Sequence, residues 1–195
     1  MDDIEKNDTD KMVFMHTCCA PCSVSCIEIL RENKLEPVLF WYNPNIHPYT
    51  EYKNRLDSLW EYSMDEGVEL IIKDEYGLKE FVEESIKDLE NRCVDICYRM
   101  RLEETAKSAK ELGYTKFTTT LLVSPYQDTE KLIEIGREIA EKYGLEFIVF
   151  DFKERFREGQ QKARDAGLYM QKYCGCIFSE AERYNKNNWK IKDKK

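Results

Sequence analysis

Residues 12–22 read MVFMHTCCAPC, and this stretch decides the fold expected for the rest of the chain. The apolar residues 12–15 predict a buried strand, and the pattern of residues 24–32 predicts a helix soon after it. The cysteines in between therefore occupy a turn from a strand into a helix N-terminus. Backbone N–H groups and the helix dipole at such a turn favour thiolates or an anionic cluster.

The alternation of strand and helix continues beyond this stretch. Strands are predicted at residues 37–42, 68–72, 117–121 and 146–150, and helices at residues 49–62, 78–89, 97–112 and 129–143. Such alternation predicts βαβ units with right-handed crossovers, and hence an α/β fold with a mainly parallel sheet of about five strands flanked by helices. Ligands of such sheets bind beyond the carboxyl ends of the strands, where residues 16–22, 43–48 and 124–128 are expected.

A chain of 195 residues suits one domain with a full hydrophobic core. We expect a disordered acidic tail over residues 1–11 and a single α/β domain over residues 12–180. Within it, residues 152–180 are expected to form a helical extension that carries the last cysteine pair. Residues 181–195 are expected to form a basic tail.

The compartment can be argued from the first residues, which are acidic and lack the basic start and apolar stretch of a signal peptide. No apolar run approaches the roughly 18 residues of a membrane span. We therefore expect a cytoplasmic protein with no membrane association. Thiols stay reduced in the cytoplasm, so metal binding or redox catalysis is favoured over a disulfide scaffold.

Seven of the eight cysteines fall into three groups, and Cys26, within the first predicted helix, is expected to be buried. The first two groups are Cys18, Cys19 and Cys22, and Cys93 and Cys97. Together they could supply the four thiolates of a [4Fe–4S] cluster if the second group folds over the sheet rim. The spacing favours iron–sulfur over structural zinc or thiol redox chemistry, and all three remain open.

The third group, Cys174-Gly175-Cys176, has a different spacing. Two thiols separated by one glycine can close a small, strained disulfide, and strained disulfides are the more oxidising and labile ones. The spacing therefore favours a redox-active pair. The alternatives are two further metal ligands or ordinary reduced thiols.

Charge is unevenly distributed along the chain. Residues 152–195 hold twelve Lys and Arg against six Asp and Glu, although the whole chain has a formal net charge of -8. The basic end could hold a polyanion locally, and the alternative is a solvated helix face with a frayed tail. On the expected rim, His47 could contact a polar substrate, and Tyr126 or Asp151 could supply a proton or bind a metal.

Five blocks of sequence, taken in order, resemble the QueH-type epoxyqueuosine reductases. The resemblance covers residues 12–180, and its blocks are HTCCAPC at residues 16–22, YNPNIHP at residues 42–48, Arg92-Cys93 with Cys97-Tyr98 and Arg101-Leu102, SPYQ at residues 124–127, and Gly167-Leu168-Tyr169 with QKYCGC at residues 171–176. The resemblance implies a Rossmann-like fold similar to the nucleotide α-hydrolases. It also implies reduction of epoxyqueuosine to queuosine at the wobble position of tRNA, the last step of queuosine biosynthesis.

The resemblance also implies a set of site residues. Carried over, the ligands of a [4Fe–4S] cluster are Cys18, Cys19, Cys93 and Cys97, and the redox-active pair is Cys174 and Cys176. We expect two residues between the second pair of ligands, whereas this chain has three. Cys22 is the substitute should Cys93 not be a ligand.

The reaction suggests further roles. Cys22 with Asp151 could hold an additional metal ion, such as iron, acting as Lewis acid on the epoxide oxygen, and Tyr126 is a candidate proton donor. Expected substrate contacts are made by Asn43, Asn45, His47, Arg155, Arg157 and Arg164. The expected partners are tRNA carrying epoxyqueuosine and an unidentified electron donor of the ferredoxin or flavodoxin kind.

Two other readings remain from the residues alone. One is an ATP-using tRNA thiolation enzyme, although the first loop lacks a glycine-rich phosphate cradle. The other is a zinc-binding or thiol redox-sensor protein.

Overall fold

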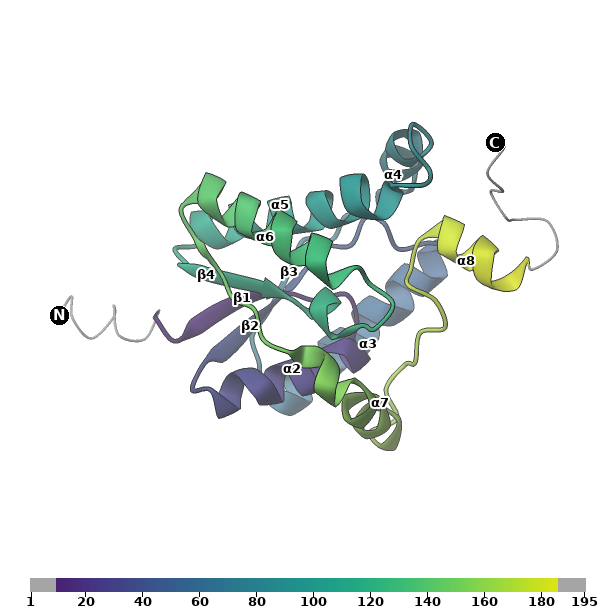
Figure 1. Cartoon of the computed structure of the whole chain (residues 1–195). Coiled ribbons are helices and arrows are strands. Elements are labelled where there is room, and N and C mark those ends of the chain that lie inside the picture. Colours follow the sequence, from purple (N-terminus) through teal and green to yellow (C-terminus); the bar gives the residue numbers. More distant parts are fainter. Residues whose placement is uncertain (1–9, 186–195) are drawn as a thin grey trace.

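The computed structural model of the protein describes residues 10–185. Its centre is a parallel five-stranded sheet in the order β3-β2-β1-β4-β5 (Figure 1). The strands are β1 (Met12–His16), β2 (Glu36–Trp41), β3 (Leu70–Ile72), β4 (Lys116–Thr119) and β5 (Glu146–Phe147). Register is fixed by pairs such as Phe14 with Val38 and Phe14 with Phe117. The expected α/β architecture is confirmed, and every strand pair in the sheet is parallel.

Helices cover both faces of the sheet. In Figure 1, α5 and α6 lie above it, and α2, α3 and α7 lie below. The α-helices are α2 (Ala20–Glu32), α3 (Tyr49–Glu66), α4 (Leu78–Ser85), α5 (Arg99–Glu111), α6 (Thr129–Tyr143), α7 (Phe156–Asp165) and α8 (Ile177–Tyr184). Shorter elements are the π-helix η1 (Arg92–Tyr98) and the 3₁₀ helices η2 (Thr120–Val123) and η3 (Phe152–Arg155).

The core lies on both sides of β1 and β2. Phe14, Met15, Leu39 and Trp41 are fully buried, as expected of strands covered by helices on both faces. Among residues 10–185, no helix is both long and apolar enough to cross a membrane.

Several element boundaries differ from the expected ones. Helix α2 begins at Ala20 rather than at residue 24, because Pro21 lies in its first turn, where proline is well tolerated. Strand β5 covers only Glu146–Phe147, and α4 ends at Ser85. Helix α8 crosses the expected boundary at residue 180. Most of the expected tails, residues 1–9 and 186–195, lies outside the described residues.

The strand order creates a crevice at one place. The chain runs from β1 outward to β2 and β3, and then returns to β4 on the other side of β1. The connections after β1 and β4 therefore diverge, and ligands of open α/β sheets bind at such a switch point. The connection after β1 carries Cys18 and Cys19, and the backbone N–H of Cys18 donates to Thr120 Oγ1, just after β4, over 3.2 Å.

Candidate metal and redox site

Three thiols meet at the start of α2. The sulfur atoms of Cys18, Cys19 and Cys22 all lie within 4.8 Å of one another, and all three residues are buried. Hydrogen bonds from Cys19, Cys22 and the Thr120 hydroxyl hold the pKa of Cys18 well below its usual range. Burial raises the pKa of Cys19 well above its usual value, whereas the pKa of Cys22 is raised first by its hydrogen bonds to Cys18 and Cys19. The group thus stabilises one thiolate in the metal-free protein.

The neighbouring histidine is structural. His16 is fully buried, with Nδ1 2.9 Å from Thr119 Oγ1 and Nε2 3.3 Å from the carbonyl oxygen of Tyr42. Burial, helped by the charge of Arg101, lowers the pKa of His16 to about 3, so the ring is neutral. The contact with a carbonyl places the proton on Nε2, and Nδ1 accepts from the threonine hydroxyl.

A π-helix presents the second group of thiols. Cys93 and Cys97 both lie in η1, which leads directly into α5. A turn of π-helix closes with a hydrogen bond one residue longer than that of an α-helix. Residues four apart lie on nearly one face of a helix, so three intervening residues still leave Cys93 and Cys97 on the same side of this segment.

A buried arginine lies against this second group. Arg101 is 3% exposed and donates from Nη2 to Cys97 Sγ over 2.9 Å, and from Nε to the Cys97 carbonyl oxygen over 3.0 Å. Its charge also acts on Cys18 and Cys174, so it stands among all three cysteine groups. No carboxylate of residues 10–185 forms an ion pair with it.

The third group lies in a loop that a buried ion pair holds in place. Arg55 is 1% exposed and donates from Nη1 to the carbonyl oxygen of Cys174 over 3.0 Å and from Nη2 to that of Tyr173 over 2.9 Å. Glu51 lies 2.7 Å from the Arg55 guanidinium. Gly175 has a φ of 137°, and a Cβ there would lie 3.1 Å from Ile46 and 3.3 Å from Arg55. A glycine is required because the loop lies so close to its support.

The two thiols of this loop differ. Cys174 is exposed, whereas Cys176 is buried and its sulfur accepts a hydrogen bond from the N–H of Ser179 at the start of α8. The hydrogen bond from Cys176 lowers the pKa of Cys174 to about 5. The pKa of Cys176 is raised by that same contact and by burial. One thiolate and one thiol therefore stand side by side.

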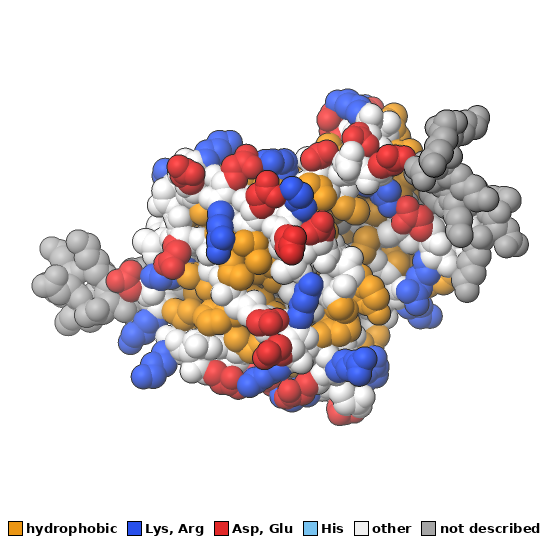
Figure 2. Space-filling model, viewed as in Figure 1, with side chains coloured by type: hydrophobic (Ala, Val, Ile, Leu, Met, Phe, Trp, Pro, Cys, Tyr) orange, Lys and Arg blue, Asp and Glu red, His pale blue; other side chains and the backbone are white. Residues whose placement is uncertain are grey.

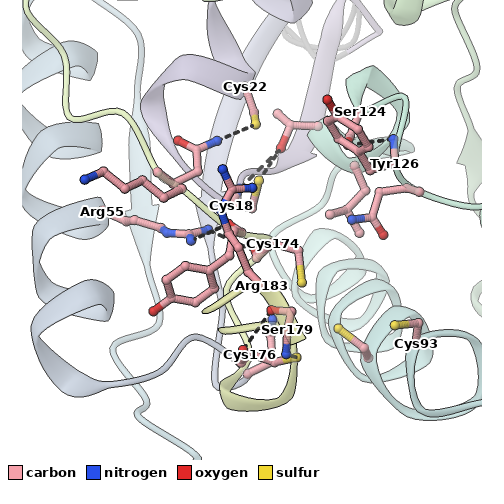
Figure 3. Close-up of a pocket in the computed structure, with 18 of the residues that line it drawn as sticks. Cys18, Cys22, Arg55, Cys93, Ser124, Tyr126, Cys174, Cys176, Ser179 and Arg183 are labelled. Carbon is pink, nitrogen blue, oxygen red and sulfur yellow. Dashed lines mark hydrogen bonds between the residues drawn. The ribbon is translucent and has the colours of Figure 1, made fainter. Parts of the chain in front are cut away.

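The three groups open into one cavity of about 1010 Å³. Figure 3 shows several of the thiols that line it, carried on separate elements. The cysteines that line it are Cys18, Cys22, Cys93, Cys97, Cys174 and Cys176.

The wall of this cavity is cationic, although the chain has a formal net charge of -8. The only carboxylate among its described lining residues is Glu182, which pairs with Arg92 over 2.5 Å. Its cations are Arg55, Arg92, Arg101, Arg157, Arg164, Lys172 and Arg183.

The cavity includes some of the expected site residues. Asn45, Tyr126, Arg157 and Arg164 line it together with six cysteines. Cys19 stands behind Cys18, with its sulfur 3.7 Å away.

Other expected site residues lie elsewhere. Asn43 is fully buried and donates to the Thr17 carbonyl oxygen, and the buried His47 contacts the Pro44 carbonyl oxygen. Asp151 is exposed and is not part of the cavity wall. Arg155 forms a two-pronged ion pair with Glu32 of α2. The structure therefore assigns fold-supporting contacts to Asn43, His47 and Arg155.

Neither Arg55 nor Arg101 was given a role in the site from the sequence, although Arg101 lies in one of the five blocks that carry the family resemblance. The spacing of Glu51 and Arg55 indicates a helical pair, but such pairs are usually on the surface. Arg101 falls four residues after Cys97, so the two share a helix face, and this spacing is a local signal for their contact.

Comparison with known proteins agrees with this geometry. The family model described as Epoxyqueuosine reductase QueH matches residues 13–182. A protein of Dehalococcoides mccartyi named Epoxyqueuosine reductase QueH is 34% identical over 176 residues, which are 90% of this chain and 96% of that protein. The Thermotoga maritima protein of the same name is 34% identical over 185 residues, 90% of this chain and 93% of the relative.

The Helicobacter pylori protein of that name is 40% identical over 184 residues, 86% of this chain but 49% of a longer relative. The match to the family model begins at the second residue of β1, includes all three cysteine groups and ends within α8. The chain belongs to the QueH family of epoxyqueuosine reductases.

Proposed function

We propose that this protein reduces epoxyqueuosine to queuosine at the wobble position of tRNA, the last step of queuosine biosynthesis. The observation that carries the proposal is the meeting of six cysteines, from three separate parts of the sequence, in one cationic cavity. Membership of the family supports the same reaction. A redox centre and an anionic substrate need these two features together.

The residues present fit an anionic metal–thiolate centre. Arg101 is a buried charge whose described hydrogen bonds from the guanidinium go to the sulfur and carbonyl oxygen of Cys97. A buried cation requires a counter-charge, and thiolates around a metal centre would supply it. A carboxylate-free thiol set of this kind suits iron–sulfur or zinc and is unsuited to magnesium or calcium.

We assign a [4Fe–4S] cluster to Cys18, Cys19, Cys93 and Cys97. A bound cluster would supply electrons one at a time at the switch point of the sheet. Cys22 is then a fifth thiol beside Cys18 and Cys19, and it is available to an additional iron ion. Asp151 is not retained as its partner, because Asp151 does not line the cavity.

The reaction needs two electrons, so a cluster that passes one electron at a time requires a second electron donor in the site. Removing an epoxide oxygen to leave an alkene takes two electrons and two protons and releases one water. Cys174 and Cys176 can deliver two electrons by passing from dithiol to disulfide, and an external donor of the ferredoxin or flavodoxin kind would then restore the dithiol. The protonated Cys176 beside an ionised Cys174 also holds one proton inside the cavity wall.

The cationic wall explains how an acidic protein can hold tRNA. Seven cations and one paired carboxylate line the cavity, so its local charge is opposite to that of the chain as a whole. A cleft whose lining side chains carry charge of one sign attracts ligands of the opposite charge and raises their local concentration. Because its substrate is tRNA and its thiols must stay reduced, we place the enzyme in the cytoplasm.

The test combines metal analysis with turnover. The protein is purified without oxygen, its iron, sulfide and zinc are measured, and it is then reduced with dithionite and mixed with tRNA that carries epoxyqueuosine. About four irons and four sulfides, and queuosine among the digested nucleosides, are expected.

Cys174→Ser is expected to lose turnover while keeping its iron, and Cys26→Ala to keep both. A colourless zinc protein that forms no queuosine even after cluster reconstitution would overturn the proposal in favour of a zinc or redox-sensor protein.

A further inference from the structure

Helix α7 carries ion-paired cations on one face and unpaired cations on the other. On one face, Lys162 forms ion pairs with Glu28 of α2 and with Glu158, each shorter than 3 Å, and Arg155, directly before the helix, pairs with Glu32. The side chains on the other face line the cavity, and they follow helical spacing at Arg157, Gln160, Gln161 and Arg164. Arg157 and Arg164 are exposed and pair with no carboxylate of residues 10–185. These four residues are called the free face of α7.

An exposed aromatic ring stands beside this free face. Tyr126 is 86% exposed, far more than any other large hydrophobic or aromatic side chain of the described residues. Its ring meets that of Phe156, the first residue of α7, edge to face with centroids 6.4 Å apart. Both residues line the cavity. Figure 2 shows blue cationic side chains over α7 and α8 on this side of the molecule.

The ring of Tyr126 is open to a ligand over most of its surface. A nucleic-acid base offers a flat apolar face that stacks on an aromatic ring, and phosphates offer charge to unpaired arginines. The cavity, at about 1010 Å³, has the size of a pocket for a complete nucleotide. An aromatic ring next to unpaired cations at the mouth of such a cavity is the usual composition of a single-stranded nucleic-acid site.

We propose that Tyr126 and the free face of α7 form the docking site for the anticodon loop of the tRNA. Tyr126 stacks against a loop base next to the one inserted in the cavity, and Arg157 and Arg164 contact loop phosphates. This inference rests on the proposed function, because the RNA is the substrate of that reaction. It replaces proton donation by Tyr126, since a hydroxyl group so open to water is poorly isolated for directed proton transfer.

The first experiment compares two pairs of neutral substitutions in and directly before α7. The double variant Arg157→Gln/Arg164→Gln removes two free cations, and Arg155→Gln/Lys162→Gln removes two that are already paired. Both change the net charge equally, and surface ion pairs contribute only about 0–1 kcal/mol, so both variants should fold. Binding to an anticodon stem-loop RNA is measured by fluorescence anisotropy over a range of salt concentrations.

The free-face variant is expected to bind more weakly, and its slope of log K against log salt should be smaller by about 1.4, from about 0.7 for each lost phosphate contact on single-stranded RNA. The control variant should match the wild type in affinity and slope. Equal losses in the two variants would overturn the proposal, because a general charge effect does not distinguish the two faces.

The second experiment separates stacking from proton donation. Tyr126→Ala is expected to weaken stem-loop binding about 5- to 140-fold, and Tyr126→Phe, which keeps the ring and loses the hydroxyl, to bind like the wild type. A fully paired duplex of the same stem should bind all three proteins equally. Unchanged stem-loop binding by Tyr126→Ala would overturn the stacking role, and loss of turnover in Tyr126→Phe with unchanged binding would return proton donation to the hydroxyl.

Failure of this inference can be told apart from failure of the proposed function. Wild-type turnover together with unaffected binding in both the free-face and Tyr126→Ala variants would reject the docking site and leave the reductase standing. Stem-loop binding that depends on these residues, without any turnover by the wild type, would reject the reaction and keep the RNA site.

Discussion

Arg101 and Cys97 form a buried contact in which a guanidinium nitrogen donates to a sulfur over 2.9 Å. Both residues are less than a tenth exposed, and no carboxylate of residues 10–185 pairs with the arginine. In the metal-free protein, this charge is only partly compensated. In a metal–thiolate form, the surrounding sulfurs would carry the negative charge that balances it.

Arg101→Met is therefore expected to have opposite effects on the two forms. The metal-free protein should keep its melting temperature or gain in it, because a poorly compensated buried charge is replaced by an apolar chain. Metal retention should fall about 10- to 100-fold, the usual effect of losing a group that supports a ligand. Thermal unfolding of the metal-free protein and the rate of iron loss to a chelator test the two halves.

The matched control for this change is Arg99→Met. Arg99 lies on the same helix but is paired with Glu138 at the surface. Its replacement should leave iron retention unchanged. A similar loss of iron in both variants would mean that Arg101 does not act on the thiols.

Substitutions of cysteines inside and outside the cavity should have very different effects on the iron content of the protein. Cys18→Ser is expected to abolish iron binding, because Cys18 belongs to the close group of thiols and lines the cavity. Cys26→Ala should keep about four irons, because Cys26 is fully buried and does not line the cavity. Iron and sulfide analysis of both purified variants checks this, and full iron in Cys18→Ser would contradict the site.

Much of the fold follows from local sequence. The strands β1 and β2 are continuous apolar runs because helices cover both of their faces, and residues of that kind are recognisable without a structure. β5 is shorter than its apolar run because it lies at the sheet edge, with a single neighbour in β4. The groups of cysteines could be recognised in the sequence because their members lie within a few residues of one another, as ligands of a shared metal or members of a redox pair often do.

The charges of the site depended on contacts distant in sequence. Arg155 and Arg157 look alike in the sequence, yet Arg155 meets Glu32, 123 residues away, and Arg157 faces the cavity. Burial of Arg101 is likewise a property of the packed helices. Sequence reasoning thus located the groups of thiols, but it could not separate free cations from paired ones.

The two thiols of the C-x-C loop should react very differently with iodoacetamide. A pKa of about 5 leaves Cys174 ionised from about pH 6 upward, whereas an ordinary thiol with a pKa of about 8.5 is about 1% ionised at pH 6.5. Alkylation of Cys174 should therefore stay fast as the pH falls to 6, slow to about half near pH 5, and be lost only below about pH 4. Mass spectrometry of the metal-free protein gives the rate at each cysteine.

The cause of this low pKa can be tested at Cys176. Cys176→Ala removes the hydrogen-bond donor, so the pKa of Cys174 should rise and alkylation at pH 6.5 should slow, with little change at pH 9. Cys176→Ser keeps a donor and should react almost like the wild type. Equal rates in all three proteins at pH 6.5 would show that Cys176 does not set the ionisation of Cys174.

Glu51 is expected to be one of the most sensitive positions outside the thiol groups. Glu51→Gln leaves Arg55, which is 1% exposed, without its carboxylate, and breaking a buried pair in this way costs about 3–5 kcal/mol. The free energy of unfolding, measured with urea, should fall by that amount without a change in slope. The surface pair of Arg31 and Glu36 provides the control, because Glu36→Gln should cost at most about 1 kcal/mol.

The loop that carries Cys174 and Cys176 should also become less well ordered in Glu51→Gln, since Arg55 donates to the carbonyl oxygens of Tyr173 and Cys174. Cleavage within residues 172–176 by a protease should be faster in Glu51→Gln than in Glu36→Gln under conditions where both remain folded, and equal cleavage would mean that the ion pair supports α3 alone.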